Sequence, residues 1–228
     1  MSENRMENMY DMLNILDERY LKLINAANAL WKAQCRQSGV NSEAWKFQGE
    51  QCFEEIAPCR YIKKQNIGFN GKEVIELQSG NGMVGVLAAL LGGNVTTTDQ
   101  LNFLEQIQNN VSINISRVCR QRIKVRALRW GEDHSNFPTD YDFILGWNIV
   151  LPSATHGKLI KTLCHIAKQT TAMYFSGQLR QESTGAFFFE ELLPRFFNCD
   201  IVDSMEDKDI FVYKIIRKGT HPGMGSQH

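Results

Sequence analysis

Two glycines and an acid are spaced in this chain as a nucleoside-binding turn requires. A short apolar strand predicted over residues 74–77 leads into Gly80 and Gly82, and Asp99 ends the next predicted strand, seventeen residues after Gly82. Glycines let the backbone approach a ligand, a helix N-terminus after the turn faces it, and an acid at the next strand end binds ribose hydroxyls. The pattern therefore predicts a Rossmann-type nucleoside site.

Two positions of this site carry alternatives. Asp99 could instead cap a helix predicted over residues 101–114, because Asp is a preferred N-cap residue, but its place after the second strand favours the ribose role. Gln78 stands where a turn of this kind normally has its first glycine. Its side chain either points away from the site or occludes it.

Two further segments are predicted to end at the same edge of the sheet. Trp130 follows the third predicted strand, where an indole either lies against an adenine face or covers the rim of the sheet. Residues 147–152 follow the fourth predicted strand. Since ligands of open α/β sheets sit at the carboxyl ends of the strands, we expect this segment to line the catalytic region.

Motifs for other chemistries are missing from the sequence. The five histidines have no spacing typical of zinc ligands, and the six cysteines form no CxxC pair. There is neither a GxSxG nucleophile elbow nor a GxxxxGKS/T phosphate loop. We therefore expect no metal centre, no hydrolase of the nucleophile-elbow type and no P-loop NTPase.

An alternation of strands and helices must position these residues. Apolar, β-branched runs predict strands at residues 72–77, 94–98, 122–127, 140–146, 170–176, 198–204 and 209–216. Helical spacing predicts helices at residues 83–91, 101–114, 155–168 and 182–196. The fold class is therefore α/β, a Rossmann-like, mostly parallel sheet with helices on both faces. The last two strands are joined by a turn too short for a crossover helix, so we expect them to pair antiparallel.

The amino-acid composition limits the classes of partner that the protein is expected to bind. Lys plus Arg and Asp plus Glu are both 25, so the chain has no global basic field and we expect no nucleic-acid partner. No apolar run reaches the ~20 residues that a membrane span needs, so no membrane partner is expected either. Scattered cysteines without a secretory signal favour reduced thiols in the cytoplasm or the nucleus. We expect a monomer.

The chain divides into three predicted parts. Residues 1–41 form an N-terminal helical extension, whose apolar stripe over residues 9–34 either packs on the domain, the reading we favour, or binds a partner. Residues 42–217 form the main domain, and residues 218–228 form a flexible tail rich in glycine and polar residues.

The order of these segments resembles the seven-β-strand S-adenosylmethionine-dependent methyltransferases, and more narrowly the methyltransferase-like 21 group of protein-lysine methyltransferases. The resemblance rests on the Val-Ile-Glu-Leu strand with its glycine turn, the Ala-Ala-Leu-Leu-Gly stretch at residues 88–92 and the Thr-Asp at the second strand end. It continues with Leu-Arg-Trp-Gly at residues 128–131, the fourth strand, and Leu-Arg with a nearby Glu at residues 179–182. It covers about residues 42 to 217.

The resemblance implies a cofactor, a substrate and roles for single residues. The cofactor would be S-adenosylmethionine and the substrate a protein lysine. Glu76, Gly80 and Gly82 would cradle the methionine part of the cofactor, Asp99 would bind the ribose, and Trp130 would lie near the adenine. The acceptor side chain would be contacted by Asn148, Leu151 and Trp45. Asn148 would be the catalytic residue.

Departures from the family pattern leave two functions open. Where the family has Asp-x-x-Tyr after the fourth strand this chain has Asn148 and Leu151, and Trp45 is followed by Lys46 where the family has an acid. We expect an active methyltransferase of a protein side chain, with lysine as the acceptor. The alternative is a catalytically degenerate relative that serves as a protein-binding module. A nicotinamide-dependent oxidoreductase fits less well, because of the closing hairpin and the Trp-Gly segment.

Overall fold

The sheet and its covering helices are described in a computed structural model of the chain. The described residues are 61–62, 64–114, 117–147, 149, 152–178, 184–205 and 209–219. The predicted N-terminal helix lies outside them, as do Trp45, Asn148 and Leu151.

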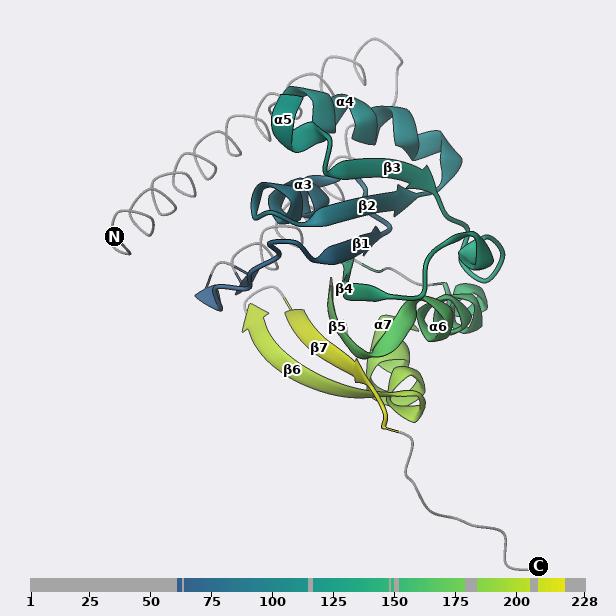
Figure 1. Cartoon of the computed structure of the whole chain (residues 1–228). Helices are drawn as coiled ribbons and strands as arrows, with labels where there is room; N and C mark the ends of the chain where they lie inside the picture. The colour runs from purple at the N-terminus through teal and green to yellow at the C-terminus, as the bar shows by residue number, and fades with distance from the viewer. Residues whose placement is uncertain are drawn as a thin grey trace, which may run out of the picture. The chain divides into compact units, whose positions relative to one another are not determined.

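Seven strands form one sheet in the order β3-β2-β1-β4-β5-β7-β6 (Figure 1). Their bounds are Glu73–Leu77 (β1), Asn94–Asp99 (β2), Ile123–Ala127 (β3), Tyr141–Gly146 (β4), Ala167–Gln178 (β5), Phe197–Met205 (β6) and Ile210–Arg217 (β7). All seven strands were predicted, with their ends shifted by three residues or fewer.

Strands β1 to β5 run parallel, whereas β7 is antiparallel to both β5 and β6. The expectation of a closing antiparallel hairpin is therefore confirmed. The parallel register brings the carboxyl ends of β1, β2, β3 and β4 to one edge of the sheet. There Leu77 pairs with Gly146, and Asp99 pairs with Ala127.

The helices agree with the predicted ones apart from their ends and some short turns. Their bounds are Met83–Leu90 (α3), Leu104–Asn114 (α4), Arg117–Arg120 (α5), Ser153–Ile166 (α6) and Thr184–Ala186 (α7). Helix α6 begins and ends two residues earlier than predicted, since β5 already starts at Ala167. The four-residue α5 and the turn η2 (His134–Asn136) were not predicted, because one helical turn has no periodicity to detect.

The predicted last helix is irregular. Helix α7 continues as a π-helical segment, η3 (Phe187–Leu192), and a 3₁₀ turn, η4 (Leu193–Arg195). A second 3₁₀ turn, η1 (Leu101–Phe103), precedes α4.

Apolar side chains cover both faces of the sheet. One core cluster joins α6 and η3 to Ile75, Ile144 and neighbouring residues, and the other joins α3 and α4 to Val74, Leu145 and neighbouring residues. Successive residues of β1 and β4 point to opposite clusters, because side chains alternate along a strand. Strands buried on both faces explain why the sequence shows continuous apolar runs.

Candidate functional site

The turn after β1 is held by β2. The Ser79 amide donates a hydrogen bond to the Thr98 carbonyl at 3.0 Å, and the Gly82 amide donates one to the Ser79 carbonyl at 2.8 Å. Gln78, Gly80 and Gly82 all have positive φ, at 52°, 58° and 77°. Three residues of the turn are thus in the left-handed backbone conformation, in which glycine is favoured.

Gln78 is the exception in this turn, because a non-glycine residue occupies a left-handed conformation there. Its amide oxygen is buried and has no hydrogen-bond partner among the described residues, and the same holds for the Ser79 hydroxyl. A strained residue and two buried polar atoms without partners among the described residues make this turn a candidate site for a polar ligand.

Asp99, the last residue of β2, is bound to the turn. One carboxylate oxygen accepts a hydrogen bond from the Gly80 amide at 2.9 Å, and the other accepts one from the Gln100 amide at 2.7 Å. Burial raises the pKa of Asp99, and the two backbone hydrogen bonds offset part of that rise. Each carboxylate oxygen keeps further acceptor capacity, which a pair of ribose hydroxyls could use.

Asp99 is not the N-cap of the next helix. The turn η1 begins at Leu101 with Gln100 as its cap residue, and no side-chain cap hydrogen bond is formed. The alternative role considered for Asp99 is therefore not the one that the geometry supports.

Glu76 and Gly82 are placed by the packing of helices on this end of the sheet. Glu76 is fully buried, and a Cβ at Gly85 of α3 would lie 2.6 Å from a Glu76 carboxylate oxygen. A Cβ at Gly82 would lie 2.9 Å from the Cγ2 atom of Ile107 in α4. Gly85 and Gly82 therefore let α3 lie close to the Glu76 carboxylate and let α4 lie close to the turn.

Trp130 lies in the turn after β3, partly buried against the core cluster on the α6 side of the sheet. The Leu128 amide donates a hydrogen bond to the Asp99 carbonyl at 2.9 Å, which ties the start of this turn to the acid. Asp99 and the turn that carries Trp130 are therefore adjacent.

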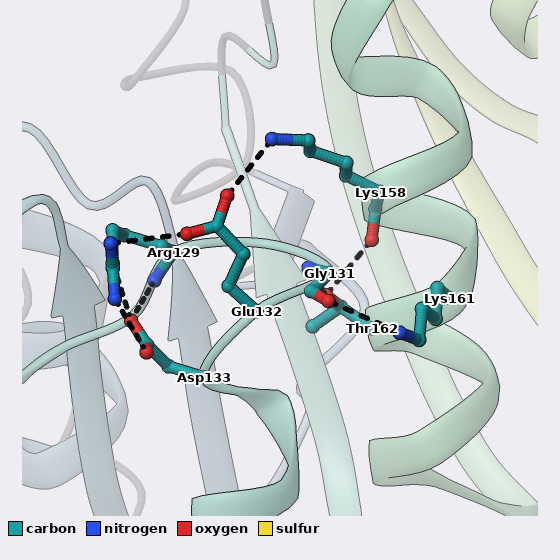
Figure 2. A network of polar contacts seen from close by, with 7 residues as sticks. All are labelled: Arg129, Gly131, Glu132, Asp133, Lys158, Lys161 and Thr162. Atoms are coloured by element: carbon teal, nitrogen blue, oxygen red, sulfur yellow. Dashed lines mark hydrogen bonds and ion pairs between the residues drawn. The ribbon is translucent and has the colours of Figure 1, made fainter.

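A network of polar contacts joins the turn after β3 to α6 (Figure 2). Glu132 forms an ion pair with Lys158 at 2.9 Å, and Arg129 forms one with Asp133 at 3.0 Å. Deeper in the network, the Gly131 amide donates a hydrogen bond to the Thr162 hydroxyl at 2.8 Å. Thr162 is not among the residues that the sequence predicts for the site. A threonine in a helix interior is the only local signal that it offers.

The segment after β4 is partly described. Trp147 is buried, and its indole nitrogen has no hydrogen-bond partner among the residues that the structure describes. The Ile149 amide donates a hydrogen bond to the Ser176 carbonyl of β5 at 3.4 Å. Asn148 and Leu151 lie outside the described residues, so their roles stay predictions.

The turn after β1, Asp99 and the turn after β3 fit a nucleoside with a polar substituent. Asp99 would hold the ribose, the Ser79 hydroxyl and the glycine turn would meet the polar substituent, and Trp130 would meet the base. In the described part of the chain, no three His, Cys, Asp or Glu side chains are grouped to hold a metal ion. None of the described helices is long and apolar enough to cross a membrane.

Comparisons with known proteins agree with this geometry. A family model described as lysine methyltransferase matches residues 23–193. EEF1A lysine methyltransferase 3 of Xenopus tropicalis is 43% identical over 159 residues, which cover 70% of this chain and 70% of that protein. Protein N-lysine methyltransferase METTL21A of Xenopus tropicalis is 32% identical over 183 residues, which cover 80% of each.

A solved structure shows the same fold. The glycopeptide N-methyltransferase MtfA, in complex with S-adenosyl-L-homocysteine, superimposes with a TM-score of 0.56 at 14% identity, over 70% of this chain and 88% of that chain. The cofactor of this chain is S-adenosylmethionine, and its substrate is a protein. Since the family model spans most of the sequence, the chain belongs to the lysine methyltransferase family.

Proposed function

We propose that this protein methylates a lysine of EEF1A. The proposal is supported by the 43% identity to EEF1A lysine methyltransferase 3, over 70% of both chains. The observation that supports cofactor binding is the Asp99 carboxylate, which accepts a hydrogen bond from the Gly80 amide where the strands end. An acid beside the glycine turn is what a Rossmann-type nucleoside site requires, which supports the ribose role proposed for Asp99.

We assign the cofactor to the turn after β1 and its neighbours. When bound, S-adenosylmethionine supplies a methyl group on a sulfonium. Glu76, Gly80 and Gly82 would surround the methionine part, Asp99 would accept hydrogen bonds from the ribose, and Trp130 would lie against the adenine. Methyl transfer needs an in-line nucleophile, so positioning by these residues would supply much of the acceleration.

Asn148 is proposed to orient the acceptor lysine, with Leu151 and Trp45 beside it. An amide oxygen accepts a hydrogen bond from the amine, but it carries no charge. Charge-assisted hydrogen bonds are roughly twice as strong as neutral ones, so Asn148 would hold a lysine ammonium more weakly than a carboxylate does. Asn148→Asp combined with Leu151→Tyr should therefore raise the rate of lysine methylation.

The test is transfer of a labelled methyl group from S-adenosylmethionine to purified EEF1A, with the modified residue mapped by mass spectrometry. We expect one labelled lysine with the wild-type chain and loss of the label with Asp99→Ala. Cofactor binding without label on EEF1A would overturn the acceptor. The absence of both, in a chain folded by circular dichroism, would instead favour a degenerate protein-binding module.

We also infer a monomer in the cytoplasm or the nucleus. The free thiols of Cys164 and Cys199 support a reducing compartment. Light scattering after size-exclusion chromatography and imaging of the tagged chain in cells would test the two statements. A stable dimer or a secreted product would contradict them.

A further inference from the structure

One buried hydroxyl of α6 holds the turn after β3. Thr162 is fully buried, and its hydroxyl donates a hydrogen bond to the Lys158 carbonyl at 3.0 Å. Because the single hydroxyl proton is used there, a lone pair is left for the Gly131 amide, which donates to it at 2.8 Å (Figure 2). The hydroxyl therefore has one defined orientation.

Gly131 fits against α6 only as glycine. Its φ is +75°, and a Cβ there would lie 2.9 Å from the Cβ atom and 3.1 Å from the Cα atom of Lys158. Since a backbone atom cannot move aside easily, the turn and the helix meet without intervening side chains. The position of the turn is thus set by the backbone of α6 and by the Thr162 hydroxyl.

The peptide that Thr162 holds is the one between Trp130 and Gly131. Fixing the Gly131 amide fixes the plane of that peptide, and hence the backbone of Trp130, which carries the indole. The other end of the turn is fixed by the Leu128 amide on the Asp99 carbonyl. Trp130 therefore stands between an anchor on the ribose acid and an anchor on α6.

We propose that Thr162 is a positioning residue for the cofactor: through Gly131 it sets the orientation of the Trp130 indole relative to Asp99. This inference rests on the proposed role of Trp130 at the adenine. Thr162 itself does not contact the cofactor, and it acts only through the turn. Helix α6 thereby takes part in cofactor binding, although it follows the acceptor-side segment in the sequence.

The ion pairs on the outside of the turn do not replace this contact. The side chains of Arg129, Glu132 and Lys158 are 65%, 44% and 53% exposed. Exposed pairs are screened by solvent and hold long side chains only loosely. Of the α6 side chains that contact the turn, Thr162 is the fully buried one, so its hydroxyl is the contact least weakened by solvent.

The first test compares Thr162→Val with Thr162→Ser in the full chain. Valine keeps the shape but leaves the Gly131 amide without its acceptor, whereas serine restores both hydrogen bonds. We expect Thr162→Val to raise the Kd and the KM for S-adenosylmethionine about three- to tenfold, with kcat within about twofold of wild type. Thr162→Ser should return both values to wild type, and an unchanged Kd in Thr162→Val would overturn the proposal.

A matched control separates positioning from stability. Thr171 is also fully buried; its hydroxyl accepts a hydrogen bond from the Lys168 amide at 2.9 Å and donates one to the Tyr141 carbonyl. It lies near the start of β5, at the edge of the sheet opposite the cofactor. Thr171→Val should lower the melting temperature as Thr162→Val does, but leave the Kd for S-adenosylmethionine unchanged. An equal rise in Kd in both variants would show a general loss of stability and overturn the proposal.

The second test is a double-mutant cycle with Trp130→Ala. If Thr162 acts through the indole, Thr162→Val should have no further effect on Kd once Trp130 is alanine. Additive effects would overturn the positioning role while leaving Trp130 at the adenine. No effect of Trp130→Ala alone would instead overturn the role proposed for Trp130, and the inference with it.

Discussion

Gln78 holds a left-handed conformation, with φ of 52°, in the turn that we propose as the cofactor site. This conformation costs a residue with a side chain about 1–2 kcal/mol. The buried amide oxygen of Gln78, which has no partner among the described residues, adds to the cost. Strain of this kind persists where the surrounding structure determines the backbone. Here the Thr98 carbonyl and Asp99 carboxylate hold the residues that follow.

Gln78→Gly should raise the free energy of unfolding by about 1 kcal/mol, since the strain relieved exceeds the entropy that glycine adds to the unfolded chain. Urea denaturation measures this change in the free energy of unfolding. The matched control is Asn66→Gly: Asn66 is exposed, has φ of 50° and is of a type that tolerates this conformation. Asn66→Gly should change the free energy of unfolding by no more than about 0.5 kcal/mol. An equal rise in the free energy of unfolding in both variants would show that strain at Gln78 is not the cause.

The ionised form of Asp99 should bind the cofactor. Because burial raises the pKa of this carboxyl above its usual 3.8, affinity for S-adenosylmethionine should fall as pH is lowered through the raised pKa, earlier than for an ordinary aspartate. The folding stability of the free protein depends on pH with the opposite sign. Protonation of Asp99 contributes stability at low pH, and this contribution is lost as pH rises through the raised pKa.

Calorimetric titration over a pH series measures this dependence. Asp99→Asn should bind S-adenosylmethionine about tenfold more weakly than the wild type at neutral pH. Its affinity should also lose the part of the pH dependence that comes from titration of Asp99. The same pH profile in both proteins would show that another group titrates.

The candidate site is predictable from sequence only where its residues are close in the chain or follow a known pattern. Gly80, Gly82 and Asp99 lie at standard distances on one strand–helix–strand unit, so their meeting could be predicted. The contact between Gly131 and Thr162 joins residues 31 positions apart, and it depends on how α6 crosses the turn. No local pattern encodes such a contact.

At the scale of elements, α3 is placed by the absence of a side chain at Gly85. A Cβ at this position would collide with the Thr97 hydroxyl and lie 2.6 Å from the Glu76 carboxylate. By contrast, a Cβ at Gly157 in α6 would meet nothing within 4 Å. Both glycines lie inside helices, so the two positions form a matched pair.

Gly85→Ala should lower the free energy of unfolding by about 2 kcal/mol, because crowding in a packed region outweighs the better helix propensity of alanine. Gly157→Ala should raise it by about 0.5–1 kcal/mol through propensity alone. Thermal and urea unfolding would show the opposite signs. Stabilisation by both substitutions would mean that α3 can move away from the sheet.

Elements differ in how well the sequence predicts them. The strands were predicted because β-branched and apolar residues fill runs bounded by polar turns, and tertiary contacts reinforce the same pattern. The start of β5 was missed: Ala167 to Thr170 are mostly polar or small, and only Ala167 among them pairs with β4, before the register shifts. The π-helical turns of η3 also have no sequence signal.

For the whole molecule, the two core clusters share one sheet and should unfold together. Ile144 and Leu145 are adjacent in β4, both fully buried, and belong to opposite clusters. Ile144→Ala and Leu145→Ala should each lower the free energy of unfolding by about 2–5 kcal/mol. Each should shift a single transition, observed equally by circular dichroism and tryptophan fluorescence. Separate transitions in either variant would show that the clusters unfold independently.

The strand order has a consequence for synthesis. Strand β7 lies between β5 and β6, although it is the last strand in the sequence. A nascent polypeptide on the ribosome therefore cannot complete this side of the sheet until Arg217 has emerged. Until then β5 exposes an unpaired edge that other chains can join. A nonsense codon between the end of β5 and the start of β7 should consequently yield an aggregating product that chaperones retain, rather than a shortened enzyme.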